Sequence, residues 1–178
     1  EAGAEACQVV VNFAGYPREA RSSAFFGRQL PPASSFADRD ALLSALQDWC
    51  NDPQGAEGTY GHVSTWCVSL VTAMNGLVNN ANTACVNTFN DDISAWDVSA
   101  VSTFDQMFYT ATAFDQDLSA WDVSKATSAG SMHHTFYGAS ALSDCNKRVI
   151  YDSWTSQTGA WHATTANNEG NWGSLCQF

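Results

Sequence analysis

The chain has 178 residues and a net charge of −11 at pH 7, with 45 % apolar and 14 % charged residues. This composition predicts one folded domain with a substantial core rather than a disordered segment. Its few basic residues are not clustered, so nucleic acid and anionic lipid are excluded as main partners. Because no apolar run approaches the roughly 18 residues of a membrane-spanning helix, we expect no direct membrane span.

Six cysteines occur at positions 7, 50, 67, 85, 145 and 176, and none forms a Cys-x-x-Cys pair. This pattern favours disulfides over a zinc or redox motif. The expected location is therefore oxidising: secreted, at the cell surface or in an organelle lumen. We favour pairing Cys145 with Cys176, because both follow the last repeat and could tie a terminal cap. The other pairings stay open.

Residues 1–55 are expected to form an N-terminal segment and a capping helix. A short strand is expected at Val9 to Phe13. Apolar residues recur at helical spacing from Ser35 to Trp49, which predicts an amphipathic helix. The segment from Asn51 to Gly55, with its Asp-Pro and Gly, indicates a loop after this helix.

Residues 56–142 are expected to form three stacked repeats. The sequence Phe89-Asn-Asp-Asp-Ile-Ser-Ala-Trp-Asp-Val-Ser returns 25 residues later as Phe114-Asp-Gln-Asp-Leu-Ser-Ala-Trp-Asp-Val-Ser, and a fainter copy lies at 61–71. Self-similarity at such a period is typical of stacked repeats, which bury a continuous core. The expected core ladders consist of Trp66, Trp96, Trp121, Val68, Val98, Val123, Met107 and Met132.

Each copy is expected to begin with a short strand, such as 93–98, and to continue as a short helix, such as 102–109. The predicted fold class is therefore α/β: a short leucine-rich-repeat-like solenoid with strand, turn and short helix in each repeat. A helical cap covers its N-terminal end. Residues 143–178 form a disulfide-tied C-terminal cap, with a helix expected at Asn146 to Trp154.

The repeated phrase Phe-Asn-x-Asp-Ile-Ser-x-Trp-Asp-Val-Ser, followed by Met107-Phe108, resembles the repeat of the BspA-like leucine-rich-repeat surface proteins. The resemblance covers roughly residues 60–142. It implies a surface, adhesion or interaction module and brings no catalytic residues. We therefore predict a non-enzymatic module for protein–protein interaction or scaffolding. The alternatives are a structural subunit of an extracellular or organelle-lumen complex, and a lectin that binds glycans with or without calcium.

Two sets of residues are candidates for binding. Aspartates at matching positions of the repeat could share a calcium ion, although carboxylates in turns also bind backbone N–H groups; no other cofactor is expected. Aromatic residues of the tail could form a surface for a partner or a sugar, or pack inside the cap. The calcium candidates are Asp92, Asp97, Asp117 and Asp122, and the aromatic candidates are Trp154, Trp161, Trp172 and Tyr151.

The sequence contains no catalytic motif of the Gly-x-Ser-x-Gly type. The adjacent residues His133 and His134 would point in different directions from a helix, so they make a poor pair of metal ligands. We expect them to be exposed loop histidines.

Overall fold

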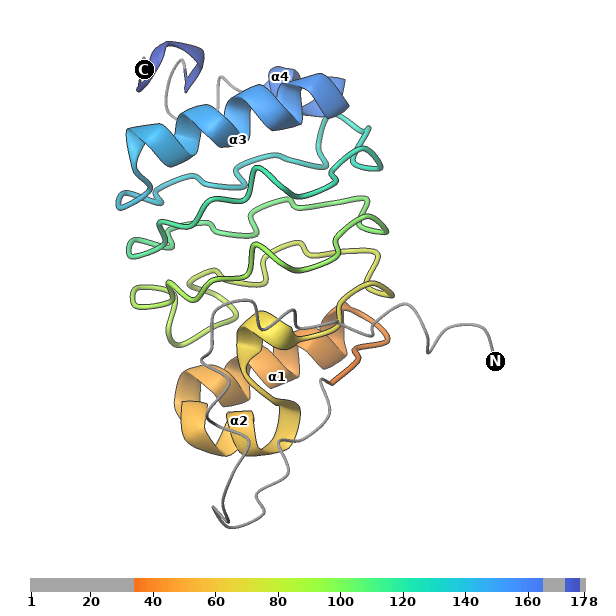
Figure 1. Cartoon of the computed structure of the whole chain (residues 1–178), viewed down its shortest axis with the longest axis vertical. Helices are drawn as coiled ribbons and strands as arrows, with labels where there is room; N and C mark the ends of the chain where they lie inside the picture. The colour runs from red at the N-terminus through yellow and green to blue at the C-terminus, as the bar shows by residue number, and fades with distance from the viewer. Residues whose placement is uncertain (1–33, 165–171, 177–178) are drawn as a thin grey trace, which may run out of the picture.

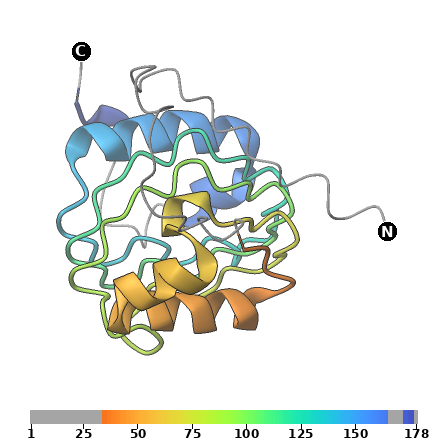
Figure 2. The same cartoon turned by 60° about the horizontal axis from the view of Figure 1, so that its bottom comes forward.

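The computed structural model describes residues 34–164 and 172–176, so the strand expected at Val9 to Phe13 lies outside the described residues. Two helices, a stack of three coils and a second helical region follow one another along the chain (Figure 1). We refer to residues 61–89, 90–114 and 115–142 as the first, second and third coil. Seen from another side, the coils follow similar paths between the two helical ends (Figure 2).

The amphipathic helix predicted before the repeats is confirmed as α1 (Arg39–Asn51). Asp38 begins it as the N-cap, because its carboxylate accepts a 2.9 Å hydrogen bond from the Ala41 N–H, which has no partner within the helix. Its apolar face packs into the hydrophobic core. The buried residues of α1 are Leu42, Ala45, Leu46 and Trp49.

The loop predicted from Asn51 to Gly55 is wrong, since a second helix, α2 (Pro53–Tyr60), begins inside it. Asp52 is the N-cap and accepts a hydrogen bond from the Gly55 N–H at 3.1 Å. Proline suits the first turn of a helix because its missing N–H would have no partner there. The Asp-Pro pair is therefore a helix start here, and Gly61, with a φ of 78°, ends α2.

The α/β leucine-rich-repeat solenoid predicted for this chain is wrong. Within the described residues, β-type pairing is limited to one isolated bridge between Ser35 and Cys67. Between α2 and the C-terminal helices, the only helical segment is the 3-10 helix η2 (Val63–Thr65). The coils therefore contain neither the strand nor the short α-helix that each repeat was expected to have.

Tight turns replace the strand that was expected at 93–98. The N–H of Trp96 donates to the carbonyl of Ile93 at 3.0 Å, and the N–H of Val101 donates to Val98 at 2.8 Å. The third coil repeats both turns at its matching positions. Because apolar residues recur here about every third position, turns bring them all inside, whereas a strand would send alternate side chains to opposite faces.

The helix expected at 102–109 is also absent, because the backbone here bonds to the neighbouring coil. The amides of Gln106 and Phe108 donate to carbonyls of the third coil at 2.9 and 2.8 Å. Gln106 and Thr110 have positive φ angles of 54° and 59°, which are incompatible with a right-handed helix. Hydrogen bonds between coils therefore take the place of hydrogen bonds within a helix.

The hydrophobic core fills the inside of the stack. The repeat tryptophans of the second and third coils also bond to the coil before them: Trp96 Nε1 donates to the Val63 carbonyl at 2.9 Å, and Trp121 Nε1 donates to Ile93 at 3.2 Å. These bonds satisfy buried indole N–H groups and fix the register between coils. The ladder residues Trp66, Trp96, Trp121, Val68, Val98, Val123, Met107 and Met132 are all buried.

The helix predicted in the tail is confirmed as α3 (Asp144–Gln157), followed by α4 (Gly159–Thr164) and the 3-10 helix η3 (Trp172–Ser174). Trp154 of α3 extends the indole ladder. It stacks on Trp121 with ring centroids 6.3 Å apart, and its Nε1 donates to the Leu118 carbonyl at 3.1 Å. The capping helix thus repeats the contacts that one coil makes with the next.

The side chain of Gln157 completes this cap. Its Oε1 accepts from the Val123 N–H at 2.8 Å, and its Nε2 donates to the Trp121 carbonyl at 3.1 Å. Exposed backbone groups at the end of a stack would otherwise be open to pairing with another chain. The third coil therefore ends against α3 with these groups satisfied.

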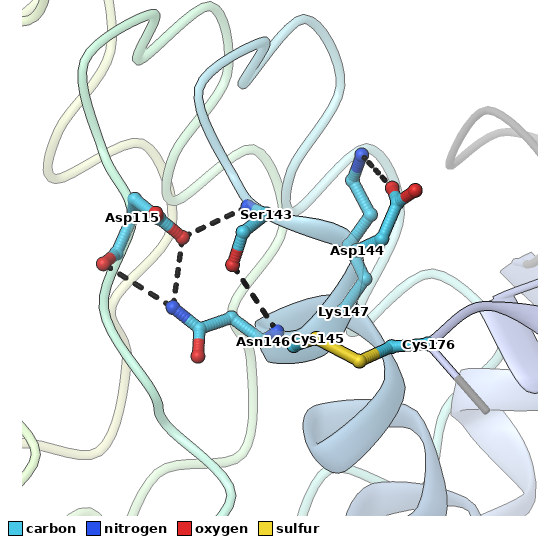
Figure 3. Close-up of a disulfide and its surroundings, with 7 residues drawn as sticks. All are labelled: Asp115, Ser143, Asp144, Cys145, Asn146, Lys147 and Cys176. Carbon is cyan, nitrogen blue, oxygen red and sulfur yellow. Dashed lines mark hydrogen bonds and ion pairs between the residues drawn. A yellow bond between two sulfur atoms is a disulfide. The ribbon is translucent and has the colours of Figure 1, made fainter. Parts of the chain in front are cut away.

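Disulfides hold both ends, and their presence is as the cysteine pattern predicted. Cys50 of α1 is joined to Cys85 of the first coil, and Cys145 of α3 is joined to Cys176. Figure 3 shows the second bond next to the joint between the third coil and α3. There Asp115 accepts hydrogen bonds from the Ser143 N–H and from the Asn146 amide (Figure 3).

Candidate functional site: the aromatic–histidine corner

The four aspartates considered for calcium all stabilise turns. Each carboxylate accepts a hydrogen bond of 2.8 to 3.1 Å from the backbone N–H two residues later, in every case a serine. Hydrogen bonds from Ser94 and Ser124 lower the pKa of the first and last of these carboxyls. We refer to residues 91–101 and 116–126, which contain these turns, as the turn edge. The aspartates are Asp92, Asp97, Asp117 and Asp122.

No metal site accompanies them in the part of the chain that the structure describes, because no three His, Cys, Asp or Glu residues there are grouped so that they could hold an ion. The carboxylates of the turn edge thus have a structural role that sequence reasoning had given as the alternative to calcium.

The tail tryptophans lie in the core of the C-terminal cap, so they do not form the binding surface that was one of their two predicted roles. Trp154, Trp161 and Trp172 are 0 %, 1 % and 4 % exposed. The ring of Trp161 meets the other two edge-on at centroid distances of 5.2 and 5.4 Å. Tyr151 is partly buried and packs against the same core.

A shallow cavity of about 320 Å³ lies beside α1 and α2. Its wall includes Asp48, Asp52 and Tyr60. The Tyr60 hydroxyl donates to Asp48 at 2.8 Å, and this hydrogen bond raises the pKa of the phenol. Asp52 caps α2 by accepting from the Gly55 N–H, and Asp48 of α1 accepts from Tyr60 of α2. Both carboxylates of the cavity therefore stabilise the junction between the two helices.

The chemically richest surface is formed where residues 105–110 of the second coil meet residues 133–138 of the third. Two tyrosines, two histidines, an aspartate and a glutamine reach the surface there, and all are partly or fully exposed. We call this surface the aromatic–histidine corner. Its residues are Asp105, Gln106, Tyr109, His133, His134 and Tyr137.

Aromatic stacking organises the corner. The rings of Tyr109 and Tyr137 stack with centroids 5.2 Å apart and an angle of 13° between their planes. The imidazole of His134 meets both rings edge-on, at 6.1 and 5.3 Å, and lies 3.7 Å from the ring of His133. Tyr137 is 39 % exposed, and only Leu70 is also large, apolar and exposed among the described residues.

The backbone of the corner is strained. Gln106, Thr110 and His134 have φ angles of 54°, 59° and 54°, in the left-handed region that side chains other than glycine rarely adopt. A β-branched residue such as Thr110 is particularly unfavourable there. Strain of this kind persists only where the surrounding structure enforces it, and it is concentrated at functional sites.

Two buried side-chain oxygens of the corner lack a hydrogen-bond partner among the described residues: Asp105 Oδ1 and Thr110 Oγ1. Burial raises the pKa of Asp105, while positive charge on His133 and His134 acts in the opposite direction. The nearest of these groups, His133 Nδ1, lies 3.9 Å from Asp105 Oδ1, which is beyond a hydrogen bond. An unsatisfied polar group in a native structure calls for an explanation, and a functional role is one.

The corner was missed from the sequence, although a signal for it was present. Phe-Tyr occurs at 108–109 and again at 136–137, at equivalent places in the second and third coils. The phenylalanine of each pair is buried, whereas the tyrosine reaches the surface. The expectation that His133 and His134 are exposed loop histidines agrees with their partial exposure and their position in turns.

A protein-family comparison matches residues 53–170 to a family described as Mycoplasma protein of unknown function, DUF285. The chain belongs to this family. The DUF285 match runs from α2 through all three coils to the C-terminal cap. Comparison with curated proteins gives no match, and comparison with solved structures gives none either.

In this DUF285 chain, none of the described helices combines the length and apolar character that crossing a bilayer requires.

Proposed function

We propose that this chain is a non-enzymatic protein-binding module that docks through the aromatic–histidine corner. The observation that carries the proposal is the partly exposed, stacked pair Tyr109 and Tyr137 on a strained backbone. Tyrosine is enriched in protein interfaces, because it offers a large, rigid surface with a polar end. The imidazole of His134 beside the rings supplies hydrogen-bonding groups at the rim.

The capped ends of the stack support the same proposal. Tight packing of Trp154 and Gln157 against the third coil leaves the end of the stack poorly suited to recruiting another chain. Side surfaces of the coils are then the places where a partner can bind, as is usual for repeat proteins. Among these, the corner joins an exposed tyrosine with unsatisfied polar atoms.

Disulfides Cys50–Cys85 and Cys145–Cys176 support export to an oxidising compartment. The repeat phrase also supports kinship with BspA-like surface proteins, a resemblance that implies a surface, adhesion or interaction module. Within this proposal, a stably bound structural subunit and a transient adhesion module differ only in how long the partner stays attached. For the lectin alternative, burial of the tail tryptophans removes one of the surfaces offered for sugar stacking, and a glycan adduct in the experiment below would favour that alternative.

Site-specific photo-crosslinking tests the proposal. A photoreactive phenylalanine replaces Tyr109 or Tyr137 in the full-length chain, and Asp97 or Lys125 on the turn edge in matched controls. We expect one protein adduct from both tyrosine positions in the native environment and none from the controls. An adduct of glycan mass, adducts from the turn edge alone, or no adduct at any position would contradict the proposal.

The captured protein must then bind in purified form. Tyr137→Ala is expected to weaken its binding about tenfold or more, as truncation of an interface hot spot does. Leu70→Ala, which removes another large exposed apolar side chain, should leave the affinity unchanged. Equal effects of the two substitutions would show that the corner is not the docking surface.

A further inference from the structure

The buried oxygen of Asp105 points to a second property of the corner. Oδ1 has no hydrogen-bond partner, and His133 Nδ1, on the neighbouring coil, lies 3.9 Å away. The two side chains are 35 % and 41 % exposed, so water reaches part of each, yet Oδ1 itself is covered. Small movements of either side chain would bring the two atoms within hydrogen-bond distance.

Protonation of the imidazole would favour that movement. Histidine is the side chain that ordinarily changes its charge between pH 5 and 8, and when protonated it carries two N–H donors and a positive charge. A charge-assisted hydrogen bond to a carboxylate is shorter and stronger than a neutral one. His133 would then supply the donor that Asp105 Oδ1 lacks.

The same contact is linked to the tyrosine pair. The Gln106 N–H donates to the His133 carbonyl at 2.9 Å, and the Thr110 N–H donates to Tyr137 at 2.7 Å. Residues 106 to 110 and 133 to 137 therefore form one run of hydrogen bonds, with Asp105 and His133 at one end and the tyrosines at the other. A new hydrogen bond between Asp105 and His133 at one end of this run would therefore restrict the movement of the tyrosines at the other end.

We propose that Asp105 and His133 form a proton-operated clasp between the second and third coils, which closes in mild acid and holds the stacked tyrosines at a fixed spacing. The raised pKa of Asp105 agrees with this assignment, because burial of the carboxyl group outweighs the opposing effect of His133 and His134. Any effect of the clasp on partner binding rests on the proposed function, whereas the clasp itself does not.

Other charged groups near the clasp modulate it. His134 lies against His133, so a second proton on this pair is opposed by the first. On the side of the first coil, Arg39 is bound to the Asn75 carbonyl and to Asp40. The cationic side chains of α3 are paired elsewhere, with Asp144 and Asp152. Among the described residues, His133 is therefore positioned to supply Asp105 with a proton-dependent donor.

Amide hydrogen exchange on the full, disulfide-intact chain at pH 8 and pH 6 tests the clasp. After correction for intrinsic exchange, protection of the Gln106 amide is expected to be about fivefold higher at pH 6, as one added hydrogen bond would give. Asp105→Asn and His133→Gln should abolish this difference. His62→Gln, a substitution of an exposed histidine in the first coil, should leave it intact.

A second readout covers the case in which a corner variant fails to fold. In the wild-type chain alone, the chemical shift of the Gln106 amide should change between pH 8 and pH 6, while the Ser124 amide on the turn edge stays constant. Equal protection at both pH values, or a difference that persists in Asp105→Asn, would overturn the clasp. Neither result would affect the photo-crosslinking test, so the two proposals can fail separately.

Discussion

The turn edge and the aromatic–histidine corner are parts of the same coils, yet the hydrogen-bonding groups of their backbone and side chains find partners in different ways. On the turn edge, each aspartate accepts a bond from a serine N–H in a short local turn, and the same turns recur in two coils. At the corner, residues have positive φ angles, and two buried oxygens lack partners. The difference indicates that the turn edge stabilises the stack, whereas the strained backbone of the corner is held in place by the stability of the stack.

The largest expected effect lies in the indole ladder behind the turn edge. Trp121→Ala should lower the free energy of unfolding by about 3 to 5 kcal/mol, because it removes a buried side chain and leaves a cavity. Tyr137→Ala at the corner should cost less than about 1 kcal/mol, since the ring is exposed. Urea unfolding at pH 7 measures both. Similar losses for the two substitutions would mean that the corner is as important for stability as the ladder.

Substitutions at two positions with left-handed backbone, Thr110 and Gly138, should change the free energy of unfolding by an intermediate amount and in opposite directions. The two residues are in contact across the second and third coils. Thr110→Gly should raise the free energy of unfolding by about 1 kcal/mol, because release of the left-handed strain exceeds the entropic cost of glycine. Gly138→Ala should lower it by about 1 to 2 kcal/mol. At Gly138, φ is 73° and an added Cβ would lie 3.2 Å from Thr110 Cγ2 and 3.4 Å from its Cα.

The turn edge offers a control for these two substitutions. Ala120→Gly, at an exposed position of the third coil, should lower the free energy of unfolding by about 0.5 to 1 kcal/mol, the ordinary cost of added glycine flexibility. A loss of stability in Thr110→Gly comparable to that in Ala120→Gly would show that Thr110 is not strained. Thermal unfolding of the variants side by side is sufficient to distinguish the outcomes.

The smallest effect concerns acid stability at the turn edge. Hydrogen bonds from Ser124 lower the pKa of Asp122 in the folded state, so this carboxylate contributes stability above its unfolded pKa and loses it as the pH falls through its folded pKa. Asp122→Asn keeps the turn geometry but cannot titrate. Below about pH 4, the stability of this variant should fall less steeply with decreasing pH than that of the wild type.

Urea unfolding from pH 7 to pH 2 measures that slope. Asp97→Asn is a suitable comparison, because its carboxylate occupies the equivalent turn in the second coil. If Asp122→Asn follows the wild-type slope throughout, the hydrogen bonds of the turn do not contribute to acid stability.

The sequence predicted the helices and the core of this molecule better than it predicted the coils. The spacing of Leu42, Leu46 and Trp49 specifies the face of α1 without reference to the rest of the fold, and the helix is present. The same reasoning failed at 102–109, because Phe104, Met107 and Phe108 are also compatible with a chain of turns. Bonds from Gln106 to the next coil decide between the two structures, and such bonds cannot be read from a local pattern.

The candidate site was less predictable than the fold for a related reason. Aspartate followed two residues later by serine specifies a local turn, and that role was given as an alternative to calcium. The corner requires Tyr109 to meet Tyr137 and Asp105 to meet His133 across two coils, with each pair about 28 residues apart in sequence. Only the stacking of the coils brings these residues together, so a recurring Phe-Tyr pair was the only local sign of them.

The most direct test of the central claim is a comparison of amide exchange in the free chain and in its purified complex with the crosslinked partner. Docking at the aromatic–histidine corner predicts slower exchange in the complex at 104–110 and 131–138, with no change at 91–101 and 116–126. Protection confined to the turn edge, or spread over the capping helices with the corner unchanged, would contradict it.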